Sequence, residues 1–158
     1  MYFIGIDIGT TSVKIIAIDE DGKIIKSVNK EYPLFFPKPL WSEQNPEDWW
    51  RETVNGLKEL FIGLDQEEVK AISFSGQMHG LVTLDENDRV IRPAILWNDQ
   101  RTEEECEYLN EEIGRSKIAQ WTGNIALTGF TAPKILWLKK NEPENFAKVR
   151  KIMVPKDY

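Results

Sequence analysis

The sequence has little of what disulfides and metal centres require. Its 158 residues include one cysteine, Cys106, and one histidine, His79. A lone cysteine cannot form a disulfide within the chain, and Cys106 lies among glutamates rather than at metal-ligand spacing from a histidine or another cysteine. This cysteine usage favours a reducing cytosol, so we expect a cytoplasmic location.

Positive charge and long apolar runs are lacking too. The 20 Lys and Arg residues are outnumbered by 26 Asp and Glu residues and form no cluster, which argues against a nucleic-acid partner. No run of about 18 apolar residues occurs, so we expect no contact with a membrane. The apolar start at Met1–Ile8 is interrupted by Asp7 and has no basic leader or small-residue cleavage site, which argues against secretion.

The remaining composition is that of a folded domain. Hydrophobic residues make up 41% of the sequence and charged residues 29%, a balance typical of globular proteins. The length suits one domain with a single hydrophobic core.

Alternation near the amino terminus predicts a sheet that begins with three antiparallel strands. In Tyr2–Ile8 the isoleucines fall on even positions, which is the period of a strand. Val13–Ile18 is a second β-rich stretch, and the turn residues Asp19–Gly22 lead into a third, Lys23–Glu31.

Helices are predicted from capping signals and periodicity. Asn45 followed by Pro46 starts the first helix. Its expected buried face is a line of apolar residues at helical spacing: Trp50, Val54, Leu57, Phe61 and Leu64. Thr102 with Glu105 forms a capping box for the second helix, and Pro133 opens the third.

Further strands are expected at Val69–Ser75, Ala94–Trp97 and Lys151–Val154, the last of them buried, with a hairpin around Asp85–Asp88. Together these elements predict an α/β domain. Its mixed sheet begins with the three antiparallel strands, and the helices pack on that sheet.

The turn between the first two strands is a candidate site for phosphate and metal. The residues concerned are Asp7, Gly9, Thr10, Thr11, Ser12 and Lys14. Gly9 leaves space for a phosphate group, the amides and hydroxyls that follow can donate hydrogen bonds, and Lys14 adds positive charge. Asp7 would repel phosphate directly, so its expected role is to bind Mg²⁺ through water. An ordinary hairpin explains these residues equally well, and neither a Walker A loop nor a dinucleotide fingerprint is present.

Two later strand ends carry polar and aromatic groups. The residues concerned are Gln77, Met78 and His79 after the strand that ends at Ser75, and Trp97, Asn98 and Asp99 at the end of the strand that begins at Ala94. Amide, imidazole and carboxylate groups can donate to and accept from the hydroxyls of a polyol, and the Trp97 ring can cover its C–H side. A hydrogen-bonded histidine at a strand end, and a turn with a helix cap, are the structural alternatives.

Five segments together resemble a known family. They are Pro39–Gln44 (PLWSEQ), Ser75–Gly80 (SGQMHG), Ile95–Thr102 (ILWNDQRT), Gly129–Lys134 (GFTAPK) and Pro155–Tyr158 (PKDY), in that family's order and spread over essentially the whole chain. With Asp7–Thr11 as a first phosphate loop, the chain resembles the FGGY carbohydrate kinases of the actin-like ATPase superfamily, and the xylulokinases among them. The resemblance implies a ribonuclease-H-like fold.

The resemblance also implies a reaction. It is the transfer of the γ-phosphoryl group of ATP, with Mg²⁺, to a hydroxyl of D-xylulose, with Met78 and His79 at the sugar site and Asp7 needed for activity. The family's general base is an aspartate of a later region, so we do not assign that role to His79. We expect residues 1–158 to be a truncated amino-terminal domain, inactive without the carboxy-terminal domain of the same enzyme. The oligomeric state stays open, with a homodimer among the options.

Two rival readings remain. The nearest is a kinase for ribulose, gluconate, glycerol or another polyol, because the same scaffold hosts several substrates. The other is a non-catalytic nucleotide-binding or interaction module of the same fold. A second glycine-rich phosphate loop and an aspartate base after Tyr158 would indicate a kinase, whereas a stop codon there would indicate the module.

Overall fold

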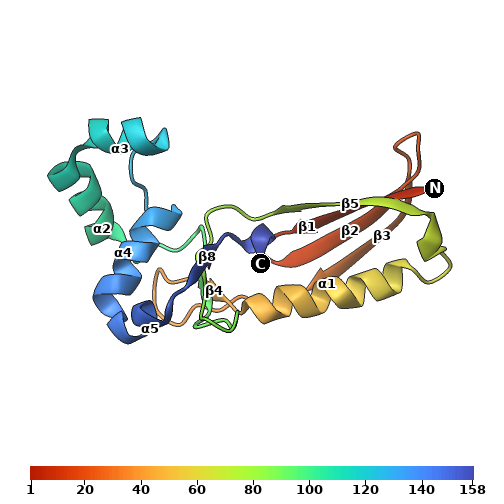
Figure 1. The fold of residues 1–158 in the computed structure, drawn as a ribbon, viewed down its shortest axis with the longest axis horizontal. Coiled ribbons are helices and arrows are strands. Elements are labelled where there is room, and N and C mark those ends of the chain that lie inside the picture. The colour runs from red at the N-terminus through yellow and green to blue at the C-terminus, as the bar shows by residue number, and fades with distance from the viewer. The chain divides into compact units, whose positions relative to one another are not determined.

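The computed structural model describes residues 1–158, which form two compact units (Figure 1). The sheet unit consists of Met1–Leu34 and Asn45–Gln77, and the helical unit consists of Phe35–Gln44 and Met78–Tyr158. Each unit has buried apolar residues of its own.

The sheet unit is built on a four-stranded sheet in the order β3-β2-β1-β5. The strands are β1 (Tyr2–Ile8), β2 (Ser12–Ile18), β3 (Ile24–Glu31) and β5 (Val69–Gly76). The first three pair antiparallel, as predicted, and β5 joins β1 in parallel, so the sheet is mixed. Figure 1 shows the four strands side by side, with one long helix running along them.

That helix, α1 (Pro46–Leu60), packs on β2 and β3. Its predicted start is confirmed, because the side chain of Asn45 accepts a hydrogen bond from the backbone N–H of Glu47. At the other end Lys26 of β3 donates to the carbonyl groups of Glu59 and Ile62. Both ends of α1 are therefore satisfied by side chains. A short 3₁₀ turn, η1 (Gln66–Glu68), then leads into β5.

The predicted buried face of α1 is wrong by one residue. Trp50 is 60% exposed. The buried line consists of Trp49, Thr53, Gly56 and Leu60, at the same spacing. Gly56 explains the difference, since a Cβ there would lie 2.7 Å from Cδ1 of Ile15 on β2. A residue without a side chain lets the helix approach the sheet closely.

The edge strand β5 exposes much of its apolar surface. Ile72 and Phe74 pair with Ile4 and Ile6 of β1, and Ile6 lies opposite Ile15, which contacts α1. Ile72 and Phe74 therefore lie on the same face of the sheet as α1. They are nonetheless 49% and 55% exposed, whereas Ile4 and Ile6 are each 2% exposed. The apolar face of the sheet extends beyond the area that α1 covers.

The helical unit combines short strands with helices. β4 (Glu43–Gln44) pairs antiparallel with β7 (Ala94–Ile95), and β6 (Val82–Leu84) pairs antiparallel with β8 (Lys151–Met153). The helices are α2 (Glu103–Glu107), the π-helical η2 (Tyr108–Gly114), α3 (Arg115–Thr122), α4 (Thr131–Asn141), α5 (Pro143–Lys148) and the short η3 (Pro155–Asp157). One apolar cluster contains Leu81, Ile95, Trp137 and Leu138, and another contains Cys106, Leu109, Ile118 and Ala126.

One predicted helix start is confirmed and another is shifted. The helix α2 begins directly after Thr102, as predicted, but Thr102 makes no side-chain cap, and its hydroxyl donates to the carbonyl of Thr128 instead. The helix expected from Pro133 begins two residues earlier, at Thr131.

The predicted strands of the helical unit also differ in detail. The hairpin around Asp85–Asp88 has a single bridge, Leu84 to Val90, and β6 pairs with β8 over its length. β7 ends at Ile95 rather than Trp97. β8 is not buried as expected, since two of its three residues are exposed.

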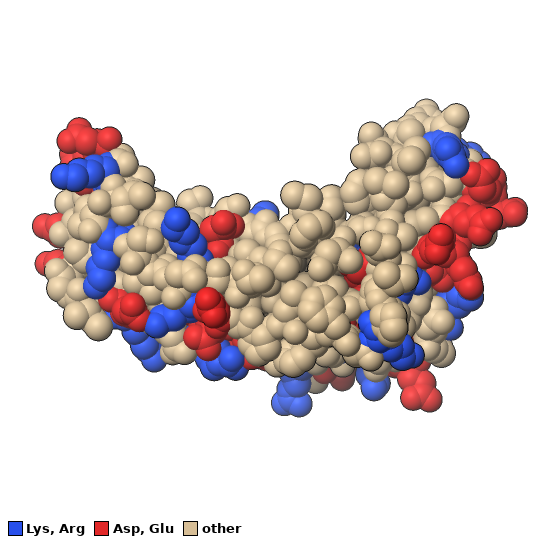
Figure 2. All heavy atoms as spheres, turned by 180° about the vertical axis from the view of Figure 1, so that it is seen from behind, with Lys and Arg blue, Asp and Glu red and all other residues tan.

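Charge is unevenly spread over the helical unit. The exposed acidic residues of α2 and η2 are Glu103, Glu104, Glu107, Glu111 and Glu112. Figure 2 shows acidic side chains gathered over these elements, while basic side chains on the same face lie in separate groups. No helix of the chain has both the length and the apolar character needed to cross a membrane.

Candidate functional site

The first candidate site is the turn of the sheet unit that joins β1 to β2. The backbone N–H of Gly9 donates to the carbonyl of Ser12 at 3.0 Å, which closes the turn. A Cβ at Gly9 would lie 3.0 Å from the same oxygen, so the turn requires glycine. Asp7 and Lys14 lie opposite each other in the β1–β2 ladder, and both are exposed, as is Thr11. The structure therefore brings the predicted phosphate and metal residues together.

Tyr32, immediately after β3, supports this turn and was not among the predicted residues. Its hydroxyl donates to the carbonyl of Gly9 at 2.6 Å, and its backbone N–H donates to the carbonyl of Thr11 at 3.2 Å. Burial, and then the negative charge of Asp7, raise the pKa of Tyr32 above its ordinary value, so the phenol remains a donor. A tyrosine after a strand is a common pattern, and the sequence has no specific signal for this contact.

Gln77 lies beside the same turn rather than with Met78 and His79. It belongs to the sheet unit, and its backbone N–H donates to the carbonyl of Ile8 at 2.7 Å. The segment predicted to bind sugar is therefore divided between the two units, with Gln77 next to the phosphate turn.

The residues of the turn fit a nucleotide and its metal ion. The chain has no group of three or more His, Cys, Asp or Glu side chains that could hold a metal ion by itself. Magnesium commonly uses one or two carboxylates together with phosphate oxygens and water. The exposed carboxylate of Asp7, beside the N–H groups and hydroxyls of Gly9–Ser12, meets that requirement.

His79 is the central residue of the second candidate site, in the helical unit. Its backbone φ of 59° is left-handed, which is uncommon outside glycine. Its carbonyl accepts hydrogen bonds from Nζ of Lys134 at 2.9 Å and from Oγ1 of Thr131 at 3.2 Å. Its ring lies 4.4 Å from that of Phe130, centroid to centroid. Burial, and then the positive charge of Lys134, lower the pKa of His79, which favours a neutral ring that can both donate and accept.

His79 lines a cavity of about 320 Å³. The other lining residues come from η2, α3, the segment between α3 and α4, and the first turn of α4: Leu109, Ile118, Thr122, Asn124, Ile125, Ala126, Phe130, Ala132 and Pro133. Polar side chains are few, and they come from His79, Thr122 and Asn124. Met78, which precedes His79, is 63% exposed.

Trp97 and Asn98 lie elsewhere in the helical unit. Asn98 lines a different cavity, of about 470 Å³, together with the segment Phe36–Ser42. Trp97 is 45% exposed, and its backbone carbonyl packs on Gly129, where a Cβ would lie 2.6 Å from the oxygen. The structure thus places His79 and Asn98 at separate cavities.

Asp99 is placed differently from the polar ligand that we expected. It is completely buried. Its carboxylate accepts hydrogen bonds from the backbone N–H of Ser42 at 2.7 Å and from Nη2 of Arg101 at 2.7 Å. A direct contact with a sugar would require this pairing to open. In the observed arrangement Asp99 fixes the segment that carries Trp97 and Asn98.

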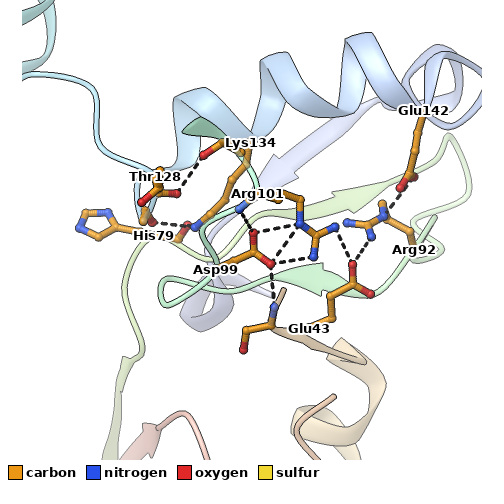
Figure 3. Close-up of polar contacts among 11 residues, drawn as sticks. Glu43, His79, Arg92, Asp99, Arg101, Thr128, Lys134 and Glu142 are labelled. Atoms are coloured by element: carbon orange, nitrogen blue, oxygen red, sulfur yellow. Dashed lines mark hydrogen bonds and ion pairs between the residues drawn. The ribbon is translucent and has the colours of Figure 1, made fainter. Parts of the chain in front are cut away.

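Asp99 belongs to a buried ion network that the sequence did not reveal (Figure 3). The side chain of Arg101 is 1% exposed and pairs with both Asp99 and Glu43. Arg92 continues the network from Glu43 to Glu142, with a distance of 3.1 Å between Nε of Arg92 and Oε2 of Glu142. These charges come from four separate parts of the chain, so the network ties the short strands to α4 and α5.

Two tryptophans enclose the central guanidinium group of this network. The Cζ atom of Arg101 lies 3.6 Å from the ring centroid of Trp41 and 4.8 Å from that of Trp137. Aromatic faces attract a guanidinium group, and more strongly where water is excluded. The pairing explains how a charged side chain can lie beside the apolar cluster of Leu81, Ile95, Trp137 and Leu138.

The chain matches the family described as FGGY family of carbohydrate kinases, N-terminal domain, over residues 2–158. It belongs to this family, which confirms the resemblance noted from the sequence motifs.

Individual relatives are also carbohydrate kinases by name. The xylulose kinase of Escherichia coli (strain K12) is 45% identical over 156 residues, which cover 99% of this chain and 32% of the relative. Among solved structures, a protein from Brucella ovis described as a xyloylose kinase is 39% identical, with a TM-score of 0.94 over 100% of this chain and 33% of the other. A gluconate kinase from Lactobacillus acidophilus is 29% identical, with a TM-score of 0.89 over 98% of this chain and 31% of the other. The chain thus spans about a third of the length of these relatives.

Proposed function

We propose that this chain is the amino-terminal part of an ATP-dependent kinase that converts D-xylulose to xylulose 5-phosphate. The observation that carries the proposal is the family match over almost the whole chain, together with relatives at about 45% identity that are xylulose kinases. The gluconate kinase of the same fold supports a second candidate, a kinase for another ketose or polyol such as ribulose, gluconate or glycerol.

In this proposal the turn of the sheet unit binds the nucleotide. ATP supplies the phosphoryl group, and Mg²⁺ neutralises charge that develops during its transfer. Asp7 binds the magnesium ion through water, and the residues that contact phosphate are Gly9, Thr10, Thr11, Ser12 and Lys14. Tyr32 keeps the turn in shape through its hydrogen bonds to the carbonyl groups of Gly9 and Thr11.

The helical unit supplies contacts to the sugar. Met78 and the neutral ring of His79 meet its hydroxyl groups, and Trp97 and Asn98 contribute from the end of β7. Asp99 acts through its buried bonds to Arg101 and Ser42, which fix the backbone after Trp97. Gln77 contributes at the phosphate turn.

The general base comes from the part of the kinase that corresponds to the remaining length of the relatives. Phosphoryl transfer requires the attacking hydroxyl, the metal ion and the phosphate to be positioned together. The 158 residues alone are therefore expected to show no phosphoryl transfer.

The test is a substrate panel with the full-length protein. ATP-dependent ADP release is measured with D-xylulose, ribulose, gluconate, glycerol and related polyols. We expect the highest kcat/KM for D-xylulose and no turnover by the 158-residue chain. A higher kcat/KM for another compound of the panel would reassign the substrate. No turnover with any compound of the panel would favour the non-catalytic module.

A variant of His79 tests the sugar site directly. In the full-length protein, His79→Ala should raise the KM for the sugar about tenfold, because a hydrogen bond to a hydroxyl is lost, with little change in the KM for ATP. Equal effects on the two KM values would count against contact between His79 and the sugar.

A further inference from the structure

Lys134 is a buried charged residue that the proposed reaction does not use. It lies in the first turn of α4, and its side chain is completely buried. Its Nζ atom donates to the carbonyl of Gly129 at 2.6 Å and to the carbonyl of His79 at 2.9 Å. The other titratable groups that act on it are those of Asp99, Arg101 and Cys106.

A lysine in this position is costly for the folded state. Burial lowers the pKa of Lys134 from 10.5 to about 7, against the opposing effect of Asp99. An apolar side chain of similar length, such as methionine, would fill the space without that penalty. Packing alone therefore does not explain a lysine here, whereas donation to two carbonyl groups does.

The two carbonyl groups belong to segments that carry the proposed sugar site. One is that of His79, whose left-handed backbone is uncommon for a residue with a side chain. The other is that of Gly129, which packs against the backbone carbonyl of Trp97. Lys134 thus joins the segment between β5 and β6, which contains His79, to the loop that rests on Trp97.

The direction of the contact is also informative. In Figure 3 the carbonyl of His79 faces the ammonium group of Lys134, and the imidazole ring points away from it. The ring packs against that of Phe130, and both residues line the cavity. Because φ and ψ set the direction of the Cα–Cβ bond, a bond that fixes the backbone of His79 also fixes where its ring points.

We propose that Lys134 is a positioning residue of the sugar site, which holds the backbone of His79 in its left-handed conformation and thereby directs the imidazole ring into the cavity. The functional part of this inference rests on the proposed role of His79 in sugar binding. The coupling between Lys134 and His79 does not depend on that role, so the two parts can be tested separately.

The coupling is measured by NMR on the 158-residue chain. Because His79 is the only histidine, every imidazole signal reports on this residue. The charge of Lys134 disfavours a charged imidazole, so Lys134→Met should raise the pKa of His79 toward its ordinary value and displace its ring signals. Lys139→Met, which removes an exposed lysine from the same helix, should change neither. A pKa and ring signals of His79 that are the same in Lys134→Met and the wild type would overturn the proposal.

The wild-type chain provides a second measurement that does not require a variant to fold. When Lys134 loses its proton near pH 7, the His79 ring signals should show a second inflection, apart from the titration of the imidazole itself. A single transition over the whole range from about pH 5 to pH 11 would contradict the coupling.

The functional part is tested by kinetics of the full-length protein. Lys134→Met should raise the KM for the sugar about tenfold and leave the KM for ATP within about twofold, while Lys139→Met leaves both unchanged. A purely structural role would lower the amount of active enzyme without this split, and that result would overturn the positioning role. If the wild-type protein phosphorylates no sugar, the proposed function fails while the NMR result stands.

Discussion

In the sheet unit the residues proposed to meet phosphate are exposed, whereas in the helical unit the charged residues behind the proposed sugar site are buried. Asp7 and Lys14 extend from a turn that backbone hydrogen bonds and Tyr32 fix. Asp99 and Lys134 are completely buried, among paired charges and backbone carbonyl groups. A change in the phosphate turn should therefore affect chemistry and leave stability nearly unchanged. A change in the buried network should affect stability as well.

The largest expected effect is on the buried ion pair. Asp99→Ala removes one of the two carboxylate partners of the buried guanidinium group of Arg101. This change should lower the free energy of unfolding by about 3 to 5 kcal/mol. The matched control is Glu59→Ala in the sheet unit, which breaks the partly exposed pair with Lys30 and should cost less than about 1 kcal/mol. Urea unfolding of the two variants measures both values. Similar losses would remove the contrast between the units.

The second prediction concerns the phosphate turn. In the full-length protein, Asp7→Asn should lower kcat about a hundredfold, equivalent to about 3 kcal/mol, because the carboxylate that holds Mg²⁺ through water is lost. Its midpoint of unfolding should stay close to that of the wild type, since the carboxylate is exposed. Asp21→Asn, at the exposed turn before β3, serves as the control and should alter neither quantity. A stability loss in Asp7→Asn as large as that in Asp99→Ala would break the comparison.

The third prediction is a pH dependence of stability that arises from Lys134 in the helical unit. Lys134 has a pKa of about 7 in the folded chain and an ordinary value of 10.5 when unfolded. Between these values the unfolded state binds more protons, so the free energy of unfolding should rise with pH, by about 1 kcal/mol per pH unit. Below pH 7 the residue is protonated in both states, so the slope disappears and the cost of burying the charged group is fully present. Urea unfolding between about pH 7.5 and pH 9.5 should show this slope in the wild type and a flatter one in Lys134→Met.

The smallest expected effect compares two glycines with similar close contacts. A Cβ at Gly129 would lie 2.6 Å from the backbone carbonyl of Trp97, and one at Gly56 would lie 2.7 Å from the side-chain end of Ile15. A backbone cannot move aside as a side-chain tip can, so Gly129→Ala should cost about 1 to 2 kcal/mol. Gly56→Ala should cost less than about 1 kcal/mol, since alanine also favours the helix. Thermal unfolding that ranks them in the opposite order would show that the sheet unit is the more tightly packed.

The strands of the sheet unit could be predicted because their signal is local. Alternating residues in Tyr2–Ile8 and the turn at Asp19–Gly22 determine the antiparallel order without help from distant segments. The buried face of α1 could not be predicted in the same way, because the line of residues that starts at Trp49 and the line that starts at Trp50 have the same spacing. The buried line contains Thr53 and Gly56, which are not apolar, and it is selected by the close approach to Ile15.

The buried network could not be predicted because its members are far apart in the sequence. Glu43, Arg92, Arg101 and Glu142 each look like solvated charges when only their neighbours are considered. In the sequence, Asp99 comes directly after Trp97 and Asn98 at the end of a predicted strand. A polar residue in that place is as compatible with a ligand contact as with an internal ion pair. Only the fold shows that the carboxylate of Asp99 accepts hydrogen bonds from the side chain of Arg101.

The uncovered outer edge of β5 has a consequence for the chain in concentrated solution. β5 is the last strand of its sheet, and its apolar side chains Ile72 and Phe74 are about half exposed. Unpaired backbone groups beside apolar side chains can act as a template for a strand of another molecule. We therefore expect the 158-residue chain to aggregate by edge-to-edge strand addition as its concentration rises, and a lysine substituted for Ile72 to improve its solubility.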